Sequence, residues 1–90
     1  MNTDNPWSVD PDCFARAMTA WRASLPDERA RNRVYDCLID ISRDPLRVGR
    51  EEEDHPGVFW VRVAGTDVGV LYTVDVDSQS ICLVSVHPVD

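Results

Sequence analysis

Apolar and polar residues alternate along the last third of the chain, a pattern typical of β-strands that bury one face. The alternation covers residues 58–64, 67–76 and 81–87, and turn-forming residues interrupt it at 65–66 and 77–80. In the second segment, one face carries Val68, Val70, Tyr72, Val74 and Val76. In the third, Cys82, Val84 and Val86 alternate with Ile81, Leu83, Ser85 and His87. We therefore predict three consecutive antiparallel strands.

Helical spacing of apolar residues replaces this alternation in the first half of the chain. The first stripe consists of Phe14, Met18, Trp21 and Leu25, and the second of Ala30, Val34, Cys37, Leu38 and Ile41. Asp10 followed by Pro11 is a favourable helix start. Asp44 followed by Pro45 ends the second helix, because a residue before proline avoids the helical conformation. This pattern predicts a helix hairpin with one shared apolar side.

These elements define one fold class and one domain. A short strand at residues 7–9 precedes the hairpin, and residues 46–57 are predicted to be a loop. We predict an α+β fold in which an N-terminal helix hairpin packs on a small twisted antiparallel sheet whose other face is open. Ninety residues suit a single core, so residues 1–90 form one domain, with residues 1–6 expected to be disordered.

The charge of the chain limits the classes of partner that it can be expected to bind. The net charge is −7, all nine basic residues are arginine, and residues 51–90 carry eight acidic residues against Arg62 alone. Non-specific nucleic-acid binding depends on many basic contacts to phosphates, so the charge disfavours RNA as a partner. No apolar stretch approaches the ~18 residues that a membrane span needs, and no signal segment is recognisable at the N-terminus. We expect a cytoplasmic protein with no membrane association.

The cysteines and the acidic run point to no cofactor. Cys13, Cys37 and Cys82 are odd in number and widely spaced, which favours buried thiols in a reducing cytoplasm. Residues 51–55, four acids and His55, include possible oxygen and imidazole ligands, but a contiguous run of this kind is more often a solvated loop. We therefore predict neither a metal site nor a cofactor.

Several short motifs and their order resemble a known family. They are Leu25-Pro26 between the helices, Asp44-Pro45 after them, and the strand sequences Val-Arg-Val at 61–63, Asp-Val-Gly-Val-Leu-Tyr at 67–72 and Val-Ser-Val-His at 84–87. Together they resemble the RelE/ParE superfamily of bacterial toxin–antitoxin toxins, over residues 7–87. The resemblance implies the same fold class that the apolar patterns predict.

The resemblance also implies candidate catalytic residues. Members similar to RelE cleave messenger RNA on the ribosome with basic side chains and a tyrosine on the open sheet face and C-terminal tail. Arg62 matches one of the basic strand positions, whereas Trp60 and Gly69 stand where the family has others. His87 resembles a histidine that ends the last strand of members similar to ParE, which inhibit DNA gyrase. The candidates are therefore Arg62, His87 and His55. The two histidines are included because an unperturbed histidine titrates near neutral pH.

Each candidate also has a purely structural interpretation. Arg62 could instead pair across strands with Asp67 or Asp75. His55 and His87 could simply be a turn residue before one strand and an edge residue after another.

An interaction surface is the family feature that depends least on these residues. Both kinds of toxin pair with an antitoxin that lies over the helices and the sheet, and candidates for such contacts are Trp60, Arg43, Arg47 and Arg50. The arginines could instead stabilise a helix C-terminus. We predict a divergent toxin-superfamily protein acting mainly through protein–protein contacts, with an antitoxin-like protein or with itself. The alternatives are a ribosome-dependent mRNA endoribonuclease using Arg62, His55 and His87, and a ParE-like gyrase inhibitor.

Overall fold

The computed structural model describes residues 6–89, so the disorder predicted for residues 1–6 falls, apart from Pro6, outside the described residues. The helices are α1 (Pro11–Arg22), α2 (Glu28–Arg43) and α3 (Pro45–Val48). The strands are β1 (Ser8–Val9), β2 (Arg50–Glu52), β3 (His55–Arg62), β4 (Val68–Asp75) and β5 (Ser80–Pro88).

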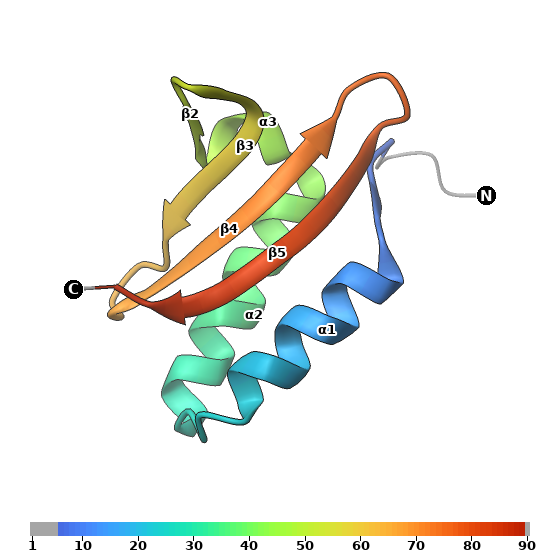
Figure 1. The fold of residues 1–90 in the computed structure, drawn as a ribbon. Helices are drawn as coiled ribbons and strands as arrows, with labels where there is room; N and C mark the ends of the chain where they lie inside the picture. The colour runs from blue at the N-terminus through green and yellow to red at the C-terminus, as the bar shows by residue number, and fades with distance from the viewer. Residues whose placement is uncertain (1–5, 90) are drawn as a thin grey trace.

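The five strands form one sheet in the order β1-β5-β4-β3-β2 (Figure 1). The three strands predicted from the alternating pattern are β3, β4 and β5, and they pair as consecutive antiparallel neighbours. The predicted short strand is β1, but it pairs with β5 in the parallel direction, so the sheet is mixed rather than purely antiparallel. The predicted α+β architecture is confirmed.

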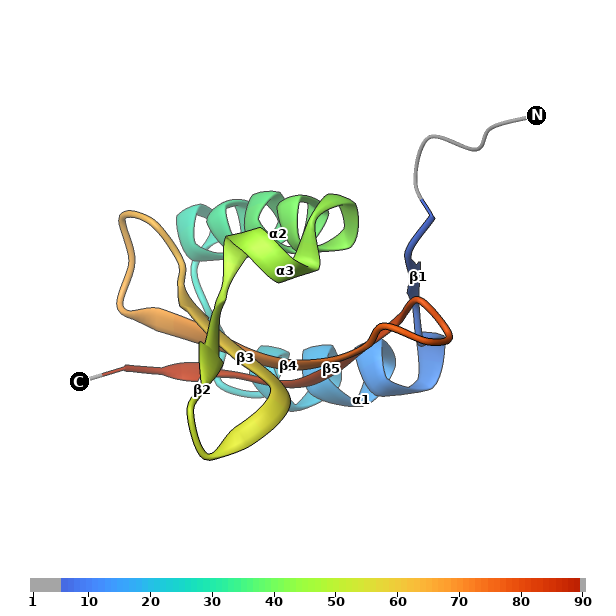
Figure 2. The same ribbon diagram turned by 90° about the horizontal axis from the view of Figure 1, so that it is seen from above.

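The helices share one core with the sheet. Helices α2 and α3 lie over one face of the sheet, while α1 runs alongside β5 (Figure 2). Asp10 and Asp27 cap α1 and α2 by accepting hydrogen bonds from main-chain N–H groups of the first turn, as residues of this type do at helix starts. Met18 and Trp21 from α1 and Val34 and Ile41 from α2 are buried in the same cluster. Leu25 does not extend the first stripe, because α1 ends at Arg22 and Leu25 lies in the following turn with 87% of its surface exposed.

The predicted loop at residues 46–57 is wrong in part. It contains the short helix α3 and strand β2, and β3 already begins at His55. All three residues of β2 are exposed, so no apolar alternation marks this edge strand in the sequence. Between α3 and β2, Gly49 passes against the ring of Tyr72, where a side chain would collide with the tyrosine hydroxyl.

The predicted alternation in the last strand is also wrong in part, because β5 contains a β-bulge. Leu71 of β4 pairs with Ser85, whereas the next residue, Tyr72, pairs with Leu83. The extra residue, Val84, is 47% exposed. A bulge shifts the alternation by one residue, so the buried positions are Ile81 and Leu83 before it and Val86 after it.

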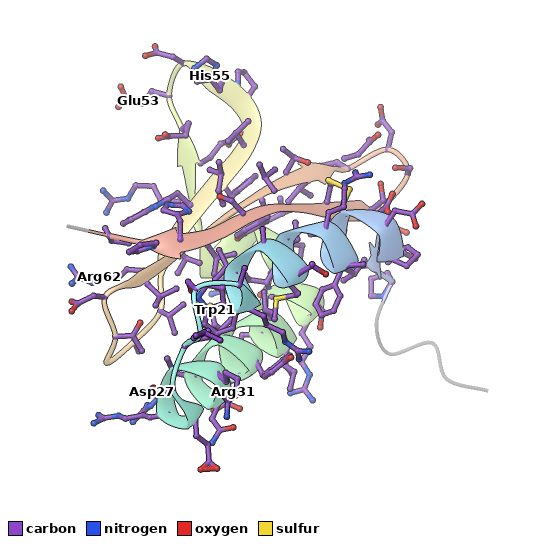
Figure 3. The ribbon with its side chains drawn as sticks, turned by 60° about the horizontal axis from the view of Figure 1, so that its bottom comes forward. Trp21, Asp27, Arg31, Glu53, His55 and Arg62 are labelled. Atoms are coloured by element: carbon purple, nitrogen blue, oxygen red, sulfur yellow. A yellow bond between two sulfur atoms is a disulfide. The ribbon has the colours of Figure 1, made fainter. Side chains whose placement is uncertain are left out.

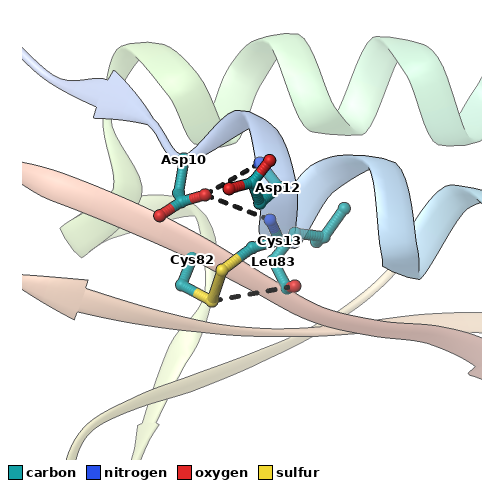
Figure 4. The surroundings of a disulfide bond; sticks show 5 residues. All are labelled: Asp10, Asp12, Cys13, Cys82 and Leu83. Atoms are coloured by element: carbon teal, nitrogen blue, oxygen red, sulfur yellow. Dashed lines mark hydrogen bonds between the residues drawn. A yellow bond between two sulfur atoms is a disulfide. The ribbon is translucent and has the colours of Figure 1, made fainter.

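Two of the three cysteines are bonded, which corrects the prediction of three thiols. Cys13 at the start of α1 and Cys82 of β5 form a disulfide across a sequence separation of 69, with their Cα atoms 5.5 Å apart (Figure 4). Their spacing in the sequence gives no sign of this pair, which arises because α1 lies alongside β5. Cys37 is free and half-buried, and burial, with a smaller contribution from Asp40, raises the pKa of its thiol to about 11.

Within residues 6–89, no helix combines the length and apolar character needed to cross a membrane.

Candidate functional site on the open face of the sheet

The strand pairing gathers the candidate residues on the sheet face that α2 and α3 leave uncovered. Gly69 of β4 pairs with Arg62 of β3 on one side and His87 of β5 on the other. In the adjacent row, Leu71 lies between Trp60 and Ser85. Directly paired residues project to the same side of a sheet, as do residues two positions apart along a strand. We call this surface the open face; it consists of Trp60, Arg62, Gly69, Leu71, Ser85 and His87, together with Arg50 of β2, which pairs with Trp60.

Gly69 is the centre of this arrangement because its neighbours close over it. A Cβ atom at this position would lie 2.7 Å from Cγ2 of Val89, 3.2 Å from Nε1 of Trp60 and 3.5 Å from Nε2 of His87. The first two distances are tighter than ordinary van der Waals contact. Val89 is held in place by a hydrogen bond of 2.7 Å from its N–H to the carbonyl of Asp67. A glycine here therefore allows the indole, the imidazole and the C-terminal segment to meet.

His87 is oriented by its neighbour on the same strand. Its Nδ1 lies 2.9 Å from the hydroxyl of Ser85, with the donor set by the imidazole tautomer. This leaves Nε2 directed toward Gly69 and the indole of Trp60. A histidine oriented by a hydrogen bond at one ring nitrogen is a suitable arrangement for proton transfer at the other.

Arg62 forms the ion pair with Asp67 that the sequence analysis gave as its structural interpretation. Its Nη2 donates to Oδ1 of Asp67 at 3.0 Å, and its Nε donates to the carbonyl of Thr66 at 3.3 Å. The arginine side chain is 51% exposed and that of Asp67 88%. An exposed pair of this kind is weak, so an incoming anion could replace Asp67.

His55 lies at the opposite end of β3 from Arg62, in the exposed β2–β3 hairpin (Figure 3). The two positions are seven steps apart along the strand, about 23 Å at the rise of an extended chain. The structure therefore brings Arg62 and His87 together and leaves His55 apart. No group of three or more His, Cys, Asp and Glu side chains among the described residues is arranged to hold a metal ion.

The predicted partner-contact residues separate into two places. Arg43 ends α2, and Arg47 lies on α3, where its Nε is 3.9 Å from a carboxylate oxygen of Asp44. Arg50 is instead in β2, paired directly with Trp60. Arg50 therefore belongs to the open face, where it is a second cation besides Arg62. The sequence does not indicate this placement, because an exposed edge strand carries no apolar pattern.

No family model and no curated protein matches the sequence. The isolated E. coli RelE toxin superposes with a TM-score of 0.69 at 15% identity, covering 93% of this chain and 83% of RelE. A chain of the toxin–antitoxin complex RelBE2 from Mycobacterium tuberculosis gives a TM-score of 0.65 at 26% identity, covering 92% and 98%.

A mutant of E. coli RelE in complex with a peptide of the antitoxin RelB gives a TM-score of 0.67 at 15% identity, covering 98% of this chain and 86% of the mutant. The chain therefore has the fold of RelE toxins, which confirms the resemblance inferred from its motifs.

Proposed function

We propose that this chain is a divergent RelE-like toxin of a bacterial toxin–antitoxin system, that it acts in the cytoplasm, and that it works mainly through protein–protein contacts with an antitoxin-like partner. The observation that carries the proposal is the likeness to the RelBE2 complex, which extends over 98% of the matched chain at 26% identity. A second fold neighbour is likewise a toxin bound to a segment of its antitoxin.

The open face supports contacts more strongly than RNA cleavage. Gly69, at the centre of the face, is covered by Val89 and Trp60. With a net charge of −7, the chain would also repel the phosphates of a polynucleotide. A half-buried tryptophan between two arginines is, by contrast, the composition of many protein-binding hot spots.

The experiment is co-expression of the chain with the product of the adjacent gene. We expect a stable complex and, for Trp60→Ala, an affinity at least tenfold lower, because a central tryptophan commonly contributes about 2 kcal/mol to an interface. Arg16→Ala, an exposed change on α1, is the control and should leave the affinity unchanged. Isothermal titration calorimetry measures both. A chain that remains monomeric and binds neither that product nor itself contradicts the proposal.

An endoribonuclease is the second candidate, favoured by the placement of Arg62 and His87 on the two sides of Gly69. In this hypothesis, the guanidinium group of Arg62 would stabilise the charge developing on a scissile phosphate while His87, oriented by Ser85, transfers the proton.

If this candidate is correct, ribosome-associated RNA from cells expressing the chain will show codon-phased cleavage. Arg62→Ala and His87→Ala should each lower the cleavage rate by about 100-fold or more, the usual effect of removing an acid–base or charge-stabilising group. His55→Ala is the matched control, because His55 lies at the far end of β3 and should leave the rate unchanged. Absence of cleavage by the unmodified chain excludes the nuclease hypothesis.

A further inference from the structure

A concave surface lies at the turn between α1 and α2, away from the acidic β2–β3 hairpin (Figure 3). The cavity has a volume of about 640 Å³. Its lining consists of Arg22, Leu25, Pro26, Glu28, Arg31, Asn32 and Tyr35. Two arginines against one glutamate make this surface basic in a chain that is acidic overall.

Both guanidinium groups are held in place by neutral partners. Arg22 donates from Nη2 to the hydroxyl of Tyr35, and its Cζ lies 5.7 Å from the centroid of the tyrosine ring. Arg31 donates from Nη1 to the carbonyl of Pro26 at 2.7 Å. Within residues 6–89, the two ion pairs involve Arg47 and Arg62. Neither Arg22 nor Arg31 is therefore neutralised by a carboxylate. A guanidinium has five N–H donors, and most of those here remain available to a ligand.

Leu25 gives this surface an apolar component. It has 87% of its surface exposed and a backbone φ of +56°, a left-handed conformation that is unfavourable for a leucine. Residues held in such conformations are concentrated at functional sites. The turn therefore presents a large apolar side chain to solvent beside the two arginines.

We propose that this surface, Arg22, Leu25, Arg31 and Tyr35, binds an acidic segment of a protein partner. Carboxylates of the segment accept hydrogen bonds from the two guanidinium groups, and an apolar side chain next to them packs on Leu25. Paired N–H donors of a guanidinium match the two oxygens of a carboxylate. Charge favours a short acidic peptide over RNA, because a long polyanion would extend beyond the two arginines to Asp27 and the acidic half of the chain. This proposal rests on the proposed function, contact with an antitoxin-like protein, only for the identity of the partner.

The test uses the isolated chain and a synthetic probe, an N-acetylated and C-amidated hexapeptide of alternating leucine and glutamate. In a nuclear magnetic resonance titration at low salt, we expect saturable shifts at the amides around Arg22, Leu25 and Arg31. The dissociation constant should be on the order of 1 mM, since exposed charge pairs are individually weak. The same peptide with glutamine in place of glutamate should bind at least fivefold more weakly.

Variants locate the binding. Arg31→Gln and Leu25→Ser should each weaken binding about fivefold. Arg29→Gln is the matched control, because it removes the same charge from the same helix at a position outside the lining. Equal weakening by Arg29→Gln, shifts spread over the whole chain, or no saturation would overturn the proposal.

Tighter binding of a uridine oligonucleotide at the same amides would also overturn it in favour of a nucleic-acid site. These outcomes are independent of the co-expression experiment, which measures the complex with the neighbouring gene product and not this surface.

Discussion

Reduction of the Cys13–Cys82 disulfide is expected to lower the free energy of unfolding by about 4 kcal/mol. The bond joins the start of α1 to β5 across a sequence separation of 69. In the chain-entropy account, breaking a bond that closes a long loop gives the unfolded chain more conformations and leaves the folded state nearly unchanged. A domain of this size has a total stability of roughly 5–15 kcal/mol, so the loss is a large share of it.

Chemical denaturation with and without a reductant measures this effect. The double variant Cys13→Ser, Cys82→Ser should reproduce the reduced midpoint and should no longer respond to the reductant. Cys37→Ser is the control, because Cys37 is free and should leave the response intact. Identical midpoints for the oxidised and reduced chain would show that the bond adds no stability.

The redox state also bears on the cytoplasmic function proposed above. Disulfides are uncommon in the cytoplasm, where thiols are kept reduced. In a chain that functions there as a dithiol, core packing alone must hold α1 against β5. Trapping of free thiols in intact cells by alkylation reports which form is present. The disulfide was outside the reach of sequence reasoning because an odd count of widely spaced cysteines fits a thiol equally well.

The larger elements could be predicted because burial imposes a period on the sequence. The stripe around Val34 identified α2, and the alternation through Val70 and Tyr72 identified β4, since both elements bury one face in the core. Elements without a buried face left no such pattern. Strand β2 is fully exposed, and this is why Arg50 could not be placed beside Trp60.

Positions within the candidate site were predictable only where they are local in the chain. Arg62 and Asp67 flank one tight turn, so the sequence alone indicated Asp67 as a structural partner of Arg62, beside the catalytic interpretation. The meeting of Arg62, Gly69 and His87 depends instead on the register of three strands, and the bulge at Val84 changes that register without a sequence signal. The placement of His55 away from Arg62 and His87 likewise followed only from the fold.

Substitution of Tyr72 by alanine should cost about 4 kcal/mol of folding free energy, the range measured for large aromatic residues truncated in cores. Tyr72 is fully buried, its ring is stacked on Phe59 at a centroid distance of 5.6 Å, and its hydroxyl donates to the carbonyl of Pro45 at 2.7 Å. It therefore connects the sheet to α3 on the side opposite the open face. Tyr72→Phe keeps the ring and should cost about 1 kcal/mol, the usual net contribution of one hydrogen bond.

Gly49→Ala tests the same contact from the other side. A Cβ at Gly49 would collide with the hydroxyl of Tyr72 and lie 3.1 Å from the carbonyl of Trp60, so the buried ring must move. We expect a loss between those of the two tyrosine variants. Denaturation midpoints measure all three, and a Gly49→Ala chain as stable as the unmodified chain would show that this part of the core can rearrange without cost.

The hydroxyl of Tyr72 should also make the stability depend on alkaline pH. Burial raises its pKa from an ordinary value of 10 to about 12, so the folded chain retains a proton that the unfolded chain releases between these values. The stabilisation is therefore complete below pH 10 and is lost as the pH rises toward 12. The measurement is best made in a Cys37→Ser background, because the thiol, with its pKa of about 11, titrates in an overlapping range. Tyr72→Phe should show a smaller loss of stability between pH 10 and pH 12, and equal slopes for the two chains would mean that this hydroxyl titrates alike when folded and unfolded.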